Sequence, residues 1–172
     1  MSDTTRQAQE VYVTGLRNQH AVEKQAVQLL ERQVERLQNY PEMEARMRAH
    51  IAESEQQAQR LQELLSQFGA TNSTLKDMGL QFMGNMAALA HAPAPDEVMK
   101  NTLANFAFEH YEIASYKSLL TLAEAVGDQS GLSALRTSLQ EEEAMARWID
   151  EHIGPTTLRF VQLSATGHTA GR

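Results

Sequence analysis

A set of five glutamates and one histidine combines side-chain types that bind metal ions with positions inside apolar helical patterns. Its members are Glu23, His50, Glu53, Glu109, Glu112 and Glu142. Each stands at or beside a position that a helical bundle normally fills with leucine or valine, where an unpaired carboxylate is costly. Carboxylates at one level of a bundle resist ionising unless a cation neutralises them. Because carboxylate and imidazole groups suit iron and manganese, the set predicts a site for two divalent metal ions.

The spacing of these acids repeats between the two halves of the chain. Glu23 and Glu53 are 30 residues apart, as are Glu112 and Glu142, and an offset of 89 residues relates the first pair to the second. Within each pair, the two acids are therefore expected at similar heights across a short turn. The repeated spacing indicates an internal duplication of a helical hairpin, although the two halves share little other sequence.

Single motifs within the set are weak signals. The motifs HIAE and EHYE, which begin at His50 and Glu109, place two ligand-type side chains on one helix face, but such patterns also occur by chance. For His50 the alternative is a hydrogen-bonded core histidine, and for His20 and Tyr116 packing beside the site is favoured over a direct role. For the acids the alternative is a buried salt-bridge network with the cationic side chains Arg17, Lys24, Arg60 or Arg147.

Apolar periodicity and turn residues divide the chain into helices. The expected segments are Thr5–Asn39, Pro41–Phe68, a short Thr74–Ala90, Pro95–Val126 and Ser130–Ile153. Short turns join the first two long helices and the last two, so each pair should pack as an antiparallel hairpin. The predicted fold is all-α, a ferritin-like four-helix bundle made of two helical hairpins joined by a long crossover that contains the short fifth helix.

Gly154 and Pro155 predict where this domain ends, because proline is unfavourable inside a helix. The bundle is therefore expected to occupy residues 1–155. Residues 156–172 would form a C-terminal tail that is either docked on the bundle or disordered.

Composition excludes several classes of protein. The 172 residues contain no cysteine, which removes disulfides, thiolate metal sites and cysteine nucleophiles. A net charge of -7 argues against a nucleic-acid partner. No apolar run approaches the roughly 20 residues of a membrane helix, and the first residues lack the pattern of a signal peptide. We therefore expect a cytoplasmic protein that binds neither membranes nor nucleic acids.

Four stretches of the sequence carry a family resemblance. They are AVEKQ at residues 21–25, HIAESEQQAQRL at 50–61, FEHYEIASY at 108–116 and SLQEEEA at 138–144. Together they resemble the YciE/YciF stress-protein family of the ferritin-like superfamily, over roughly residues 11–153. The resemblance implies a stress-associated protein, often a homodimer, with a carboxylate-rich dimetal site. It assigns that site to Glu23, Glu53, Glu112 and Glu142, completed by His50 and Glu109.

The expected function is that of a dimetal-carboxylate protein. Such a protein would bind two iron or two manganese ions and react with peroxide, oxygen or ferrous iron during stress. The lack of cysteine excludes a rubredoxin-like electron-donating module and so disfavours a self-contained peroxidase of the rubrerythrin type. The alternative is a non-enzymatic structural or interaction bundle in which metal serves stability or dimerisation. An open coordination position favours the first function, and a sealed, saturated site favours the second.

Overall fold

Capping and turn residues set the helix boundaries in the computed structural model, which describes residues 2–70 and 94–171. The side chain of Ser2 caps the first helix by accepting from the backbone N–H of Thr5, and Gly127 ends a later helix in the left-handed conformation, with φ of 75°. The helices of the described residues are α1 (Asp3–Val34), α2 (Pro41–Gln67), α4 (Glu97–Val126) and α5 (Gln129–Ala165). The fifth helix predicted at Thr74–Ala90 lies outside the described residues.

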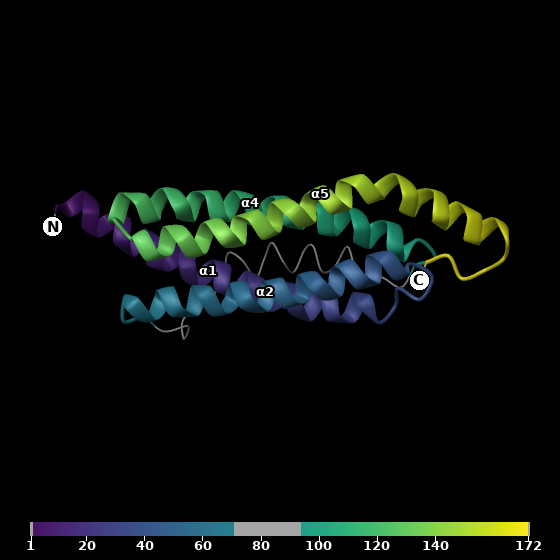
Figure 1. Ribbon diagram of the computed structural model, residues 1–172, viewed down its shortest axis with the longest axis horizontal. Helices are drawn as coiled ribbons and strands as arrows, with labels where there is room; N and C mark the ends of the chain where they lie inside the picture. Colours follow the sequence, from purple (N-terminus) through teal and green to yellow (C-terminus); the bar gives the residue numbers. More distant parts are fainter. Residues whose placement is uncertain (1, 71–93, 172) are drawn as a thin grey trace.

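The helices pack as two antiparallel hairpins, α1 with α2 and α4 with α5, and α1 lies against α4 while α2 lies against α5 (Figure 1). The Tyr116 hydroxyl donates to Glu23 Oε1 at 2.6 Å, and the amide of Asn105 donates to Gln33 Oε1 at 2.8 Å. The residue numbers of the partners on α4 therefore fall as those on α1 rise, so these two helices run antiparallel. The prediction of an all-α four-helix fold is confirmed.

Two apolar clusters fill the ends of the bundle and leave a polar level between them. The first apolar cluster includes Leu30, Val34, Met47, Val98 and Ile149. The second apolar cluster includes Tyr12, Leu16, Leu61, Leu119 and Leu135. Each helix buries polar side chains between its contributions to the two clusters, and on α1 and α4 a small third cluster of Val22, Ala26 and Phe108 lies in the same stretch. Within the described ranges, no helix combines the length and apolarity needed to span a membrane.

The last helix is longer than the sequence predicts. We expected it to end at Ile153, before Gly154 and Pro155, and that boundary is wrong because α5 continues through Pro155 to Ala165. A proline inside a helix removes one backbone hydrogen bond, so packing has to offset the loss. Thr156 and Leu163 are buried, and Leu163 belongs to the first apolar cluster.

The residues after α5 fold back onto the turn between α1 and α2. The Tyr40 hydroxyl donates to the carbonyl oxygen of Ala170 at 2.6 Å, and the backbone N–H of Val98 donates to the carbonyl of Gly171 at 3.2 Å. The C-terminus thus lies beside that turn, as Figure 1 shows. The helix before this turn also ends earlier than expected, because α1 ends at Val34 and not at Asn39.

Candidate metal centre

Ligand-type side chains from all four helices meet at the polar level between the two apolar clusters. They are Glu23 from α1, His50 from α2, Glu109 and Glu112 from α4, and Glu142 from α5. Each is at most 1% exposed. Helical repetition explains this burial: Glu23, for example, lies one heptad from Leu16 and one from Leu30, so the face that buries the leucines also buries the acid.

One group of potential ligand atoms comes from His50, Glu109 and Glu142, whose ligand atoms all lie within 4.8 Å of one another. Nε2 of His50 is 3.2 Å from Glu109 Oε2 and 3.7 Å from Glu142 Oε2. None of these three atoms makes a hydrogen bond within the part of the chain that the structure describes. Buried polar atoms are nearly always satisfied, so three that face one another without partners indicate a place for a cation.

A second group comes from Glu23, Glu112 and Glu142, also within 4.8 Å. Nε2 of Gln19 donates to Glu23 Oε1 at 2.9 Å and to Glu112 Oε1 at 3.2 Å, and the Tyr116 hydroxyl donates to Glu23 Oε1 at 2.6 Å. Neutral donors thus hold one oxygen of each acid, while Oε2 of Glu23 and of Glu112 has no partner among the described residues. Glu142 belongs to both groups and would serve both if each held an ion.

Burial opposes ionisation of these carboxyl groups. It raises the pKa of Glu23 to about 7, and burial together with the neighbouring acids raises the pKa of Glu112 and of Glu142 well above the usual range. Burial lowers the pKa of His50, but the carboxylate of Glu109 outweighs it and holds that pKa well above its ordinary value. When all four buried glutamates are ionised their charge equals that of two divalent cations, so two such ions would neutralise the level.

Glu53 lies outside both groups, on the far side of the imidazole. Its side chain is 32% exposed, and its Oε2 is 2.8 Å from Nδ1 of His50, whereas Nε2 of that ring faces the carboxylates. Nη1 of Arg46 also donates to Glu53 Oε2, at 3.0 Å. Glu53 and Glu142, which the 89-residue offset relates, therefore differ in burial, and the direct ligand role of Glu53 stays a prediction. A carboxylate in this place fixes the orientation and tautomer of a metal-binding histidine.

Sequence reasoning missed two polar side chains at the same level, namely Gln19 and Gln57, each at most 1% exposed. Nε2 of Gln57 donates to Glu142 Oε1 at 2.5 Å. The signal was available, because Gln57 follows His50 by one heptad and precedes Leu64 by another. An amide in such a seam is as informative as an acid.

Arg60, one of the four cations considered for a buried salt-bridge network, pairs with an acid outside the buried level. Arg60 makes a bidentate pair with Glu141, at 2.7 and 2.9 Å, and not with Glu142 in the core. The other neighbour of the buried acid, Glu143, pairs with Lys117 at 3.3 Å on the surface. These two pairs lie outside the buried level, so Arg60 is not paired with the buried Glu142.

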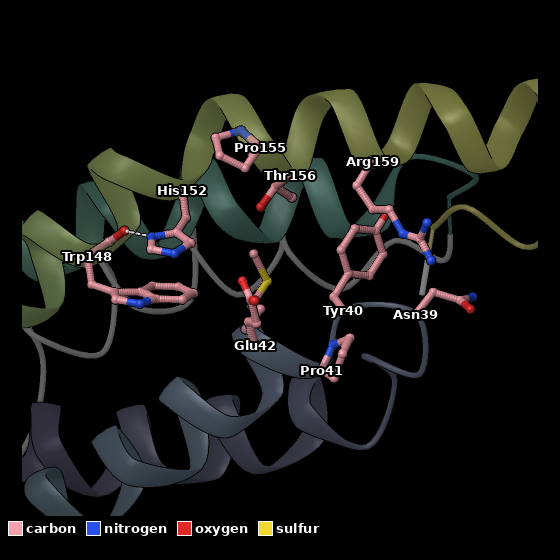
Figure 2. Close-up of a pocket in the computed structure, with 10 residues that line it drawn as sticks. Asn39, Tyr40, Pro41, Glu42, Trp148, His152, Pro155, Thr156 and Arg159 are labelled. Carbon is pink, nitrogen blue, oxygen red and sulfur yellow. Dashed lines mark hydrogen bonds between the residues drawn. The ribbon is translucent and has the colours of Figure 1, made fainter.

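A surface pocket of about 330 Å³ lies elsewhere, between the start of α2 and the second half of α5 (Figure 2). The rings of Trp148 and His152 stack along it with centroids 3.8 Å apart, and Tyr40 and Arg159 lie farther along. None of the six predicted site residues lines this pocket. It is therefore separate from the buried carboxylates.

Comparison with known proteins agrees with this architecture. Residues 7–162 match the family described as Domain of unknown function (DUF892). Protein YciF of Escherichia coli K12 is 27% identical over 143 residues, which cover 79% of this chain and 84% of YciF. The resemblance carried by the four sequence stretches is thereby confirmed.

Solved structures share the fold. A Xanthomonas campestris protein superposes with a TM-score of 0.78 at 28% identity, over 92% of this chain and 99% of that one. The Escherichia coli stress protein YciF gives a TM-score of 0.72 at 24% identity, over 85% and 94% of the two chains. YcfI of Rhodopseudomonas palustris gives 0.74 at 24% identity, over 87% and 97%. With a family match across almost its whole length, the chain belongs to the DUF892 family.

Proposed function

We propose that this chain is a ferritin-like dimetal-carboxylate protein that binds two divalent ions, either iron or manganese. The observation that carries the proposal is the convergence of five side chains, from four helices and at most 1% exposed, with unpartnered atoms facing one another. Burying those atoms without a partner is costly, and two divalent ions would relieve both the charge and the missing contacts. The direct ligands would be Glu23, His50, Glu109, Glu112 and Glu142, with Glu53 acting through His50.

Bound iron or manganese supplies redox chemistry toward peroxide, oxygen or ferrous iron as substrate. The chain's part is to position the ligands and to leave room for the small reactant. Each group is made of three residues, so a bound ion would also take ligands from water or from a small reactant. Open positions of this kind favour reactivity over a purely structural metal.

One relative supports a role in stress, and the compartment, the dimer and the reactant are part of the proposal. The Escherichia coli YciF protein is described as a stress protein, and we extend that role to this chain as a cytoplasmic homodimer that consumes peroxide or oxygen. Light scattering on the purified chain tests the dimer: a single species of twice the 19.2 kDa chain mass is expected.

The second function is a non-enzymatic bundle that uses metal for stability or for dimerisation. The observation in its favour is the enclosure of the polar level by apolar clusters on both sides. A sealed site restricts the approach of reactants and would make metal release slow.

Peroxide consumption and ferrous oxidation distinguish the two functions. Apo protein, protein loaded with iron or with manganese, and the free metal at equal concentration would be assayed in parallel. Turnover by a loaded form well above that of free metal supports the redox function. If both loaded forms melt at a higher temperature than the apo form yet react no faster than free metal, the structural function is correct.

A further inference from the structure

We propose that the two metal positions are chemically unequal. In this account the His50 position holds an ion such as Zn²⁺ or Fe²⁺ tightly, and the Glu23 and Glu112 position holds a harder ion such as Mn²⁺ more weakly. The inference rests on the proposed dimetal function and adds the selectivity and order of loading. It would make the protein a mixed-metal carrier or centre, depending on which ions are supplied.

Donor chemistry provides the first argument. The group of His50, Glu109 and Glu142 contains an imidazole nitrogen, Nε2, that has no hydrogen-bond partner in the described part of the chain and lies 3.2 Å from Glu109 Oε2. The group of Glu23, Glu112 and Glu142 contains carboxylate oxygens only. Imidazole favours ions of borderline softness, such as zinc and ferrous iron, whereas sites made only of oxygen suit magnesium and manganese.

The surroundings of the two groups differ in the same sense. Behind His50, Glu53 holds Nδ1 at 2.8 Å, which preorganises Nε2 for a metal and increases its basicity. Beside the other group, the donors are neutral: Gln19 and Tyr116 both donate to Glu23 Oε1. Donated hydrogen bonds draw electron density from a carboxylate and weaken it as a ligand. The affinity for a metal ion is therefore expected to be higher at the position that contains the nitrogen and lower at the position made only of oxygens.

A further polar atom lies beside the weaker position. The Oε1 atom of Gln19 is buried and has no partner within the described residues, while its Nε2 contacts both Glu23 and Glu112. Because the amide turns its Nε2 to these acids, the carboxylate oxygens are the ligand atoms of this position. This composition fits an exchangeable Mn²⁺ or Mg²⁺ ion better than a tightly held zinc or iron ion.

Sequential loading tests the inference without any activity assay. Apo protein labelled with ¹⁵N in histidine receives one equivalent of Zn²⁺ and then one of Mn²⁺, followed by desalting and metal analysis. We expect the first equivalent to shift the Nε2 resonance of His50, assigned with His50→Gln, and the desalted protein to retain about one ion of each metal per chain. Because two equal positions would also retain one ion of each metal, the response of the His50 resonance to the first zinc equivalent carries the test.

Two near-isosteric variants locate each preference. Glu112→Gln should keep one ion at the position that contains His50. The ratio of Zn²⁺ to Mn²⁺ affinity in this variant should exceed the ratio in His50→Gln, where an amide replaces the nitrogen donor, by at least about tenfold. Circular dichroism confirms that both variants are folded. Equal preferences in the two folded variants, or a His50 resonance that the first zinc equivalent leaves unmoved, would overturn the inequality. Wild-type protein that retains neither metal would instead contradict the proposed dimetal function itself.

Discussion

The buried acids make the apo protein sensitive to pH in an unusual direction. The pKa of Glu23 rises from 4.5 to about 7 in the folded chain, and burial and neighbouring acids also raise the pKa of Glu112 and Glu142. Between pH 4.5 and about 7, Glu23 keeps a proton in the folded chain that it has released in the unfolded chain. The stabilisation is complete at low pH and is lost as the pH rises through the folded pKa, by an amount on the order of 3 kcal/mol for Glu23 alone. The raised pKa of His50 acts in the same sense.

We therefore predict that the melting temperature of metal-free protein falls between about pH 5 and about pH 8. Addition of Mn²⁺ or Fe²⁺ under anaerobic conditions should reverse the fall at the upper end, because ligands must be deprotonated to bind. Differential scanning calorimetry with and without a chelator measures both effects. An apo melting temperature that rises over this range would show that the buried carboxyl groups are not protonated as described.

Glu53 provides a test of support without direct ligation. In Glu53→Gln the amide cannot hold the imidazolium or the neutral ring as the carboxylate does at 2.8 Å, so Nε2 of His50 becomes a weaker ligand. Metal affinity should fall about 10- to 100-fold while the fold is kept. Glu55→Gln is the matched control, since Glu55 is exposed on the same helix. Calorimetric titration measures both variants, and equal affinities would mean that Glu53 has no role at the site.

At the scale of helices, the sequence predicts burial better than it predicts boundaries. The heptad rows identified Glu23 and Glu142 as core acids because burial depends only on helical periodicity and the neighbouring leucines. Glu53 was assigned by its distance from other acids, and periodicity would have placed Ser54 inward instead, where the structure has it. The end of α5 could not be predicted from Pro155, because tertiary packing of residues beyond the proline outweighs the local preference.

The start of α5 offers a paired test of packing at glycines. A β-carbon on Gly131 would overlap the side chains of Asp128 and Tyr12, whose hydrogen bond joins the α4–α5 turn to α1. We predict that Gly131→Ala lowers the free energy of unfolding by about 1–3 kcal/mol. A β-carbon on Gly154, in the same helix, meets no atom within 4 Å, so Gly154→Ala should raise it by about 0.5–1 kcal/mol. Urea denaturation measures both, and equal effects of the two changes would refute this view of the turn.

For the whole molecule, hairpin pairing and the polar level were predictable because short turns and repeated spacings constrain them. The inequality of the two hairpins could not be predicted, since Glu53 and Glu142 each follow their partner acid by 30 residues and yet differ in burial. In the folded chain, α1 and α4 supply three of the buried acids, α5 supplies one, and α2 supplies the histidine. The bundle therefore concentrates negative charge on the side of α1 and α4 and reserves the nitrogen donor for the side of α2.

The central claim is that the buried level binds two divalent ions, and Glu142 is the residue that belongs to both groups. Metal analysis of desalted protein would compare the wild type, Glu142→Gln and the neighbouring control Glu143→Gln, whose native side chain pairs with Lys117 at the surface. We predict about two ions of iron or manganese per chain in the wild type and the control, and well below one in Glu142→Gln. Wild-type protein without bound metal, or a folded Glu142→Gln protein that retains as much metal as the control, would contradict the account.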